Sequence, residues 1–442
     1  EEQARAALSI IGQPLPEQRI GWAVFLILQV IGHLRARNPA LEPGAGPRTP
    51  AHIDIVTGAV NVFAEASYFS GSVVALAASN LFAVNLAKSA GNLASAARAS
   101  ATIGYLFGLF RLHRLARGFF ERPRAACIEA GDLVGYHATL GGQAMYELGF
   151  GRWKQADTTV AQAIELCRKS GNPQDTEIAL TMAGLAAHYR GRFAESYKLF
   201  SDLCDSASRR ANKQHMAWGL YAMAQNLLPM GRATPALTLL DRAGKMLEGA
   251  EDRHSLLIWR GLVALAHLYL RDYQRAREIG LQSANEAERV PPSNFGSLVG
   301  YSSPAIILIA LWMRALQFAP TEAPQLELMT DRAIRRLAAF AQIFPIGQPR
   351  LLLIRGWSSW YQGKPARARK HWQACIDRAA TFDMPYERGL AHLGMQRVVE
   401  NASQLGTHRR TGYALLAGLK AVPLPFEINE VGDLQSWSAE PS

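Results

Sequence analysis

A pattern of glycine, basic and small residues returns every forty residues along the middle of this chain. The stretch YRGRFAES places Gly191 before an arginine and a phenylalanine, with Ser196 five residues later. Gly151 and Gly231 stand forty residues to either side, and arginine follows each of them. A fixed period of this length indicates repeated supersecondary units, in which each unit packs against its neighbours. A repeat array therefore constrains the fold more than any other feature.

The register extends beyond these three glycines. Arg111 and Arg271 continue the series at the same spacing, and Gly363 repeats the pattern further along the chain. A second series of glycines has the same spacing: Gly91, Gly131 and Gly171. Two turns in each period predict two helices in each unit.

Apolar residues between the turns recur at intervals of three and four, as in Ile178, Met182 and Leu185. This is helical spacing rather than the alternation of a strand. Two helices in forty residues leave about 16–18 residues each, or about 25 Å. Glycine is expected to end the first helix because it adopts left-handed backbone without a Cβ penalty. Small residues are expected five positions later, where the two helices approach closely: Ala156, Ser196, Ala236, Ala276 and Ala368.

The turn pattern is G-x-[aromatic]-x-x-A, with Gly184 and Gly356 seven residues before it and Phe200 and Trp372 at a large-residue position after it. It resembles the tetratricopeptide (TPR) repeat. The resemblance implies an all-α fold, a right-handed α-solenoid of TPR-like helical hairpins with a period of about forty residues. The chain departs from the pattern at the tyrosine position of the first helix, which holds other residues: Ala187, Leu227 and His267.

The stretch from Gly363 to Leu393 carries a second resemblance. It is similar to the C-terminal solenoid of large bacterial signalling proteins, in which a class III adenylate/guanylate cyclase domain or a kinase precedes a P-loop ATPase module. This resemblance implies that any catalytic activity belongs to domains upstream of the solenoid.

Four segments are expected along the chain. Residues 1–38 form an N-terminal helical segment that caps the solenoid or joins it to an upstream domain, and 39–50 form a linker rich in proline and glycine. Residues 51–420 form the solenoid, and 421–442 form an irregular, frayed tail, because its prolines interrupt the helical period.

Two apolar runs are candidates for membrane spans, Gly21–Gly32 and Pro304–Met313. Both are shorter than the roughly 20 residues that a span requires, so they are expected to be buried helices. The four cysteines form no CxxC pair, which favours buried thiols in a cytoplasmic protein over disulfides or a zinc site: Cys127, Cys167, Cys204 and Cys375.

The motifs of several enzyme classes are absent from the sequence. It contains no G-x-x-x-x-G-K-[ST] phosphate loop, no G-x-S-x-G elbow and no H-E-x-x-H zinc helix. The net charge of +11 allows an acidic partner without requiring nucleic acid. We therefore expect a chain that is not an enzyme and has no cofactor or metal, and nucleic acid is not its expected partner.

Two surfaces are candidates for binding. The faces that would line a TPR groove carry aromatic and polar side chains, which suit capture of a peptide or helix. These groove candidates are Thr181, His188, Trp218, Tyr221, Gln225, Arg350, Trp357 and Trp360. Alternatively, the tryptophans only pack against neighbouring helices. The second surface is a basic ridge of residues that each follow a turn glycine: Arg152, Arg192, Arg232 and Lys364.

The ridge also has a local explanation, since a basic residue at a helix C-terminus contributes about 0.3–1 kcal/mol through the helix dipole. A denser basic group lies on the helix after Gly363 and could meet an acidic partner domain: Arg367, Arg369, Lys370 and His371. A solvated helix face is the simpler interpretation of this group.

The favoured hypothesis is a non-catalytic interaction and regulatory arm of a multidomain bacterial signalling ATPase or cyclase, which binds a protein partner through the solenoid groove. The alternative is a solenoid of the transcription-activator type that senses a small ligand. A buried polar cluster of His188, Gln225 and Arg260 would favour this alternative. An enzyme hidden in the groove is the least favoured, because no acid, base and nucleophile are predicted to converge on one face.

Overall fold

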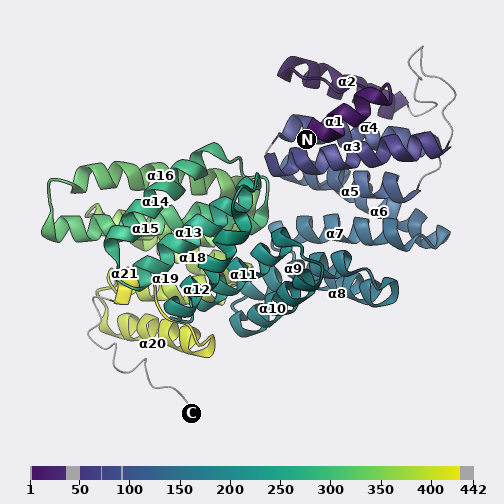
Figure 1. Cartoon of the computed structure of the whole chain (residues 1–442). Helices are drawn as coiled ribbons and strands as arrows, with labels where there is room; N and C mark the ends of the chain where they lie inside the picture. Colours follow the sequence, from purple (N-terminus) through teal and green to yellow (C-terminus); the bar gives the residue numbers. More distant parts are fainter. Residues whose placement is uncertain (1, 36–49, 71, 91–92, 429–442) are drawn as a thin grey trace. The chain divides into compact units, whose positions relative to one another are not determined.

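The computed structural model describes residues 2–35, 50–70, 72–90 and 93–428 (Figure 1). Within these ranges the regular structure is helical throughout, from α1 to α21 with two short 3-10 helices, and there is no strand. The predicted all-α class is confirmed. Nearly all of the predicted linker at 39–50 lies outside the described residues, and so does the predicted turn at Gly91.

The described helices form two compact units. Unit 1 comprises Glu1–Leu148, Lys154–Ala179 and Glu251–Arg253. Unit 2 comprises Gly149–Trp153, Leu180–Ala250 and His254–Ser442.

Unit 1 is built from the first helices of the chain. They are α1 (Glu2–Ile10), α2 (Arg19–Arg35), α3 (Pro50–Ser70), α4 (Val73–Ala90), α5 (Leu93–Leu109), α6 (His113–Ala130), α7 (Leu133–Gly149), α8 (Trp153–Ser170) and the first part of α9 (Pro173–Tyr189). The N-terminal helices pack onto this unit, since Leu8 and Trp22 share a core with Val60 and Phe63. The rings of Trp22 and Phe63 stack with centroids 5.4 Å apart.

The apolar run Gly21–Gly32 is helical, as predicted, but the expectation that it is buried was wrong. Only one face of α2 packs into the core, through Trp22 and its neighbours. The opposite face is exposed, and Ile27 and Leu28 leave 59% and 54% of their surface accessible. An apolar helix is buried only on the faces against which other helices pack, and in α2 this is one face.

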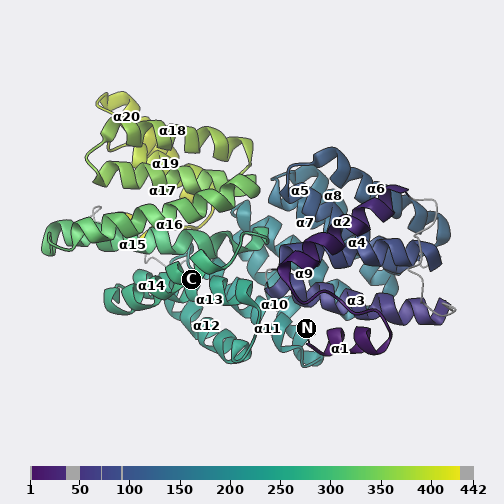
Figure 2. The same ribbon diagram turned by 90° about the horizontal axis from the view of Figure 1, so that it is seen from above.

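Unit 2 is built from the remaining helices. They are the end of α9, α10 (Phe193–Arg209), α11 (Lys213–Leu227), α12 (Ala233–Leu247), α13 (Arg253–Tyr269), α14 (Tyr273–Arg289), α15 (Leu298–Phe318), α16 (Ala323–Ile343), α17 (Gln348–Tyr361), α18 (Pro365–Thr381), α19 (Pro385–Met395), α20 (Ala402–Gly418) and α21 (Pro425–Ile428). Figure 2 shows successive helices from α14 to α18 lying side by side.

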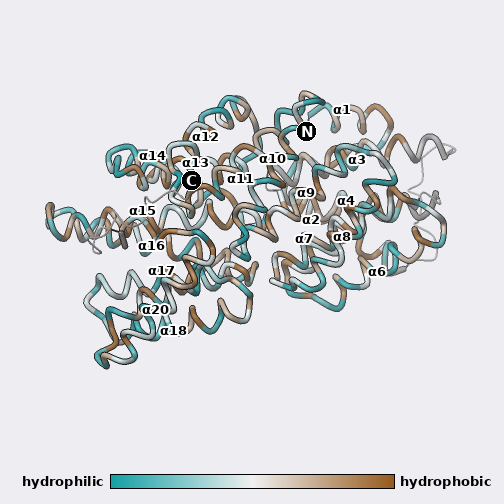
Figure 3. The backbone as a smooth tube through the Cα atoms, turned by 90° about the horizontal axis from the view of Figure 1, so that it is seen from below, coloured by the Kyte–Doolittle hydropathy of each residue, from teal (hydrophilic) through white to brown (hydrophobic). Residues whose placement is uncertain are grey.

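Inner and outer helices of unit 2 differ in their polarity. Hydrophilic residues gather on the outer helix α14, where only four small residues are buried (Figure 3). The neighbouring helix α15 is apolar on all sides. Among the described residues, Phe295–Phe318 is the one helical stretch long and apolar enough to cross a membrane, and its most apolar window is wholly buried. The predicted buried helix at Pro304–Met313 is therefore confirmed as part of the core of unit 2.

Residues with left-handed backbone end the helices at the predicted turn positions. Arg111 and Arg271 belong to this series with φ of 60°, although they are not glycines. The turn glycines have φ between 65° and 73°: Gly131, Gly151, Gly171, Gly191, Gly231 and Gly363. The prediction of glycine caps is confirmed at these positions.

The turn after α9 shows how such a cap works. The amide of Gly191 donates to the carbonyl of His188, and the amide of Arg192 donates to the carbonyl of Ala187, each at 2.9 Å. These two bonds form a Schellman cap, which satisfies carbonyls that the helix end leaves unpaired. A residue with positive φ at the Gly191 position is what allows both bonds to form.

The predicted close approach between paired helices is also confirmed. A Cβ on Gly184 would lie 2.6 Å from the Phe200 ring, so only glycine fits there. The hydroxyl of Ser196 donates to the Gly184 carbonyl at 2.7 Å across the same contact. The five small residues that follow the turns have no exposed surface: Ala156, Ser196, Ala236, Ala276 and Ala368.

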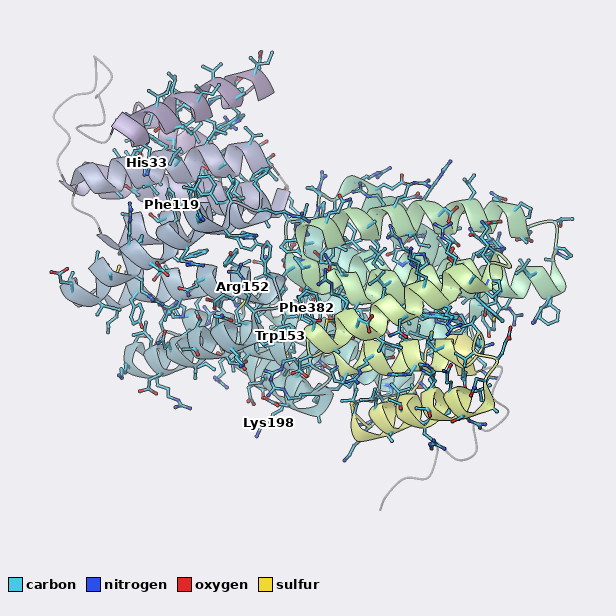
Figure 4. All side chains as sticks on the ribbon, turned by 180° about the vertical axis from the view of Figure 1, so that it is seen from behind. His33, Phe119, Arg152, Trp153, Lys198 and Phe382 are labelled. Atoms are coloured by element: carbon cyan, nitrogen blue, oxygen red, sulfur yellow. The ribbon has the colours of Figure 1, made fainter. Side chains whose placement is uncertain are left out.

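Within unit 2, the turns at Gly151 and Gly191 both contact the turn between α18 and α19, about two hundred residues later in the sequence. The indole N–H of Trp153 donates to the carbonyl of Phe382, and Figure 4 shows the two residues side by side. Two further contacts join the same region: Arg190 with Asp383 at 3.1 Å, and Phe193 with Tyr386 at 5.6 Å between ring centroids. We call these three pairs the closure contacts.

The beginning of the predicted tail is packed rather than frayed. Residues 421–428 include α21, and Phe426 is buried with its ring edge-on to Trp357 at a centroid distance of 5.2 Å. The amide of Val422 donates to the carbonyl of Pro229 at 2.7 Å. The prolines do interrupt the helix, as expected, but apolar side chains between them hold this segment on unit 2.

Candidate functional site

A cavity lies on the inner helices of unit 2, next to the closure contacts. It holds about 630 Å³ of empty space, counted out to its open mouth. Residues from α9, α10, α11, α13, α15, α17 and α19 line it, together with Leu228 and Pro229 after α11 and Leu424 from the C-terminal segment. Three of the predicted groove residues lie here: His188, Gln225 and Arg350.

Hydrogen bonds fix the protonation of His188. The Asn226 amide nitrogen donates to the Ala222 carbonyl at 2.8 Å, which leaves its Oδ1 facing Nδ1 of His188 at 2.9 Å. Nδ1 therefore carries the proton, and Nε2 accepts from the Gln225 amide at 2.9 Å. Burial lowers the pKa of His188 to about 4, so the ring is neutral at pH 7.

The charged part of the cavity wall is an ion pair between α17 and α19. Arg350 donates from Nε and Nη2 to the same oxygen, Oε1 of Glu387, at 3.1 and 2.5 Å. Only 4% of the Glu387 side chain is exposed, and the neighbouring charge of Glu387 raises the pKa of Arg350 against the effect of burial. Buried ion pairs are weak contributors to stability compared with apolar packing, so this one suggests a functional role.

The rest of the cavity wall is mainly aliphatic. Its apolar side chains are Leu228, Pro229, Leu262, Leu265, Leu298, Val299, Ile306 and Leu424. Mostly apolar walls with a few convergent polar groups are typical of small-molecule sites.

The other groove candidates lie away from this cavity. Trp218 donates to Ser255 at 3.0 Å, and Tyr221 contacts the same hydroxyl at 3.4 Å, which ties α11 to α13. Trp357 is 1% exposed and packs against Trp372, so it is a core residue. Two are partly exposed and do not line the cavity: Thr181 on α9 and Trp360 on α17.

The sequence-based cluster of His188, Gln225 and Arg260 needs a correction. His188 and Gln225 are bonded to each other, but Arg260 pairs with Glu286 on α14 at 2.7 Å. Arg350 occupies the place in the cavity that was assigned to Arg260. Glu387, its partner, was missed because the two residues are 37 positions apart and meet only through helix packing.

The ridge residues lie at helix starts, as their place after the turn requires. Arg192 and Arg232 are N-caps without a side-chain capping bond, and Arg192 pairs with Glu195 at 3.1 Å. Lys364 donates to Gln362 at 3.1 Å, and the Arg152 guanidinium lies 5.8 Å from the Phe150 ring centroid. Local contacts are therefore present for Arg152, Arg192 and Lys364, while the helix-dipole explanation of the ridge stays a prediction.

Unit 1 contains a second polar cluster, which the sequence did not predict. Nε2 of His137 lies 3.3 Å from Sγ of Cys167, and Nδ1 lies 3.3 Å from Asp175. This is a thiol, an imidazole and a carboxylate in the order of a nucleophilic triad. These three residues lie outside the predicted groove, so the expectation that no acid, base and nucleophile converge there stays a prediction.

Burial argues against catalysis at this cluster. Cys167 is 3% exposed and packs with Leu140 and Leu166 in an apolar core. Burial raises the pKa of the Cys167 thiol and lowers the pKa of His137, so both groups are neutral and no thiolate forms. Among the described residues, no group of three or more His, Cys, Asp or Glu could hold a metal ion.

No protein-family model matches this chain, and no curated protein matches it.

Proposed function

We propose that the chain is a non-catalytic regulatory module that binds a small ligand in the cavity of unit 2. The observation that carries the proposal is the Arg350–Glu387 pair, which lies in a mainly apolar cavity wall beside the neutral His188–Gln225 pair. Of the two hypotheses raised by the sequence, this supports ligand sensing over capture of a peptide. The cavity also brings together residues from both sides of the closure contacts.

The proposed mechanism is a shift of equilibrium. The cavity is lined by Phe193 and Tyr386, which themselves form one of the closure contacts. A ligand that touches both sides binds the closed arrangement more tightly than an open one, so it stabilises closure by its difference in affinity. Attached modules would receive this change as a change in the shape or stiffness of the arm.

The repeat architecture belongs to the same proposal. Positive φ at turn positions forty residues apart, and fully buried small residues five positions later, support TPR-like hairpins in a right-handed solenoid. We propose that the module is a soluble, cytoplasmic arm of a multidomain bacterial signalling ATPase or cyclase, or of a transcription-activator-type regulator.

The test is ligand-induced stabilisation of the full chain. Thermal unfolding would be followed with four compounds that share a branched alkyl group but differ in charge: L-leucine, 4-methylpentanoate, isoamylamine and isoamyl alcohol. At least one should raise Tm in a concentration-dependent way. The variant Leu265→Trp fills the cavity and should abolish the shift, whereas Leu270→Trp, in the exposed turn after the same helix, should retain it. The proposal fails if no compound shifts Tm.

A second candidate function, docking of an acidic protein partner, rests on the distribution of charge. Residues 348–420 contain twelve lysines and arginines against four acidic residues. Burial lowers the pKa of Arg355, and repulsion from Arg367 lowers it further. Burial likewise lowers the pKa of His371, and the positive charges of Arg355, Arg367 and Lys370 add to this effect. The variant Arg367→Glu reverses one charge of this group, so cross-links from Lys370 to acidic segments of a partner should be lost in it. If the cross-links persist, the basic group is not the docking site.

A further inference from the structure

The polar groups of the cavity have bonding capacity that the described residues do not use. Both bonds from Arg350 go to Oε1 of Glu387, so Nη1 of Arg350 and Oε2 of Glu387 have no partner among the described residues. Gln225 donates its amide N–H to His188, which leaves its carbonyl oxygen as a further acceptor. These three side chains therefore offer one cationic donor and two acceptors, one of them anionic.

Charge balance restricts what can bind there. A ligand that is only an anion would pair with Arg350 but place its charge beside the Glu387 carboxylate. A ligand that is only a cation would meet Glu387 but lie beside the Arg350 guanidinium. In a buried site either like-charge contact is unfavourable, because the low dielectric screens it poorly. A ligand with one charge of each sign meets both groups without this penalty.

The neutral pair beside the charges also restricts the ligand. His188 stays uncharged because of its burial, so it adds no second cation to the site. Beyond the polar groups, Leu262, Leu265 and Ile306 offer an aliphatic surface. Burial of an alkyl side chain against such a surface is favourable by about 0.8 kcal/mol for each methylene.

We propose that the ligand is a small zwitterion with an aliphatic side chain, of the α-amino acid class. Its carboxylate accepts from Arg350, its ammonium group donates to Glu387 and Gln225, and its side chain lies against the leucines and isoleucine of the cavity. This inference rests on the proposed function, because it names the class of ligand for the same cavity.

The experiment is isothermal titration of the full chain with L-leucine and two capped analogues. N-acetyl-L-leucine lacks the ammonium group, and L-leucinamide lacks the carboxylate. L-leucine should bind saturably, and each analogue should bind at least tenfold more weakly. Gln225→Leu removes one acceptor of the ammonium group and keeps both members of the ion pair, so it should weaken binding of L-leucine. Leu270→Trp, the control outside the cavity, should leave binding of L-leucine unchanged.

The outcomes separate the ligand class from the function. Equal affinity for L-leucine and either capped analogue would overturn the zwitterion. Binding of 4-methylpentanoate or isoamylamine without binding of L-leucine would also overturn it, while leaving the cavity as the binding site. L-leucine binding that survives Leu265→Trp would place the site elsewhere. Absence of binding by every compound of the panel would remove both this inference and the proposed function.

Discussion

The polar clusters of the two units contain similar chemical groups in different surroundings. In unit 1, His137 lies between Cys167 and Asp175, and the thiol is enclosed by leucine and alanine side chains. In unit 2, Arg350 and Glu387 lie beside His188 in the wall of a cavity. The first cluster has the residue types of an active site but is enclosed, and the second lines a cavity.

This difference shows that residues with reactive side chains can lie close together without forming an accessible active site. Without access, burial keeps the Cys167 thiol and the His137 ring neutral, and the cluster joins α7, α8 and α9 as part of the core. The ion pair of unit 2 is also buried, but it lines a cavity, and the cost of burying two charges is the reason for proposing a functional role there. Four substitution experiments test or sharpen this contrast.

The largest effect is expected for Glu387→Gln. It leaves the Arg350 guanidinium buried without its carboxylate, so the free energy of unfolding should fall by about 3–5 kcal/mol. The matched substitution in unit 1, Asp175→Asn, should have a much smaller effect, since 20% of the Asp175 side chain is exposed and its histidine partner is neutral. Urea denaturation followed by circular dichroism measures both. Similar losses of unfolding free energy in the two variants would show that the two clusters do not differ in this respect.

The second effect is a pH dependence that comes from His188. Its pKa is about 4 in the folded chain and near 6.5 when unfolded. Between these values the unfolded state binds a proton that the folded state does not, so stability falls as pH falls through the window, by up to about 1.4 kcal/mol per pH unit. His188→Gln should remove this contribution, as measured by urea denaturation from pH 4.5 to 7.

The corresponding variant in unit 1 sharpens this test. Burial lowers the pKa of His137, but the adjacent Asp175 opposes the shift. His137→Gln should therefore change the pH dependence less than His188→Gln does. The reverse order would show that His188 is more hydrated than its position in the cavity wall implies.

A smaller effect is expected for Cys167→Ala. The substitution removes one partner of His137 and leaves a small void, so the free energy of unfolding should fall by about 1–2 kcal/mol. Iodoacetamide should label Cys167 in the native protein only at the rate at which unit 1 opens, which peptide mass spectrometry can follow. Rapid native labelling would mean that the thiol is accessible, and the cluster would again be a candidate active site.

The smallest effect is expected at matched turns of the two units. Arg111 and Arg271 hold the left-handed backbone that glycine adopts without a Cβ penalty. Arg111→Gly and Arg271→Gly should each raise the free energy of unfolding by about 0.5–1 kcal/mol, as measured in urea. Gly131→Ala and Gly363→Ala are controls with open space around the Cβ, and they should have the opposite sign. A loss of stability in both arginine variants would contradict the cap geometry.

Local chemistry in the sequence was sufficient to predict the helical hairpins. Glycine at positive φ, a small residue five positions later and the pairing of Gly184 with Phe200 are properties of one turn and its two helices. These local features could be read from the chain because each depends on short-range contacts. Half of the polar cluster, His188 with Gln225, could also be predicted from helical register.

Only the tertiary structure decided which polar groups share a cavity. Glu387 reaches Arg350, Cys167 reaches His137 and Phe382 reaches Trp153 through packing between helices that are 30 to 229 residues apart in sequence. The helical period states which face a residue occupies but not which distant helix covers that face. Access and burial follow from that covering, and they separate the buried thiol of unit 1 from the cavity of unit 2.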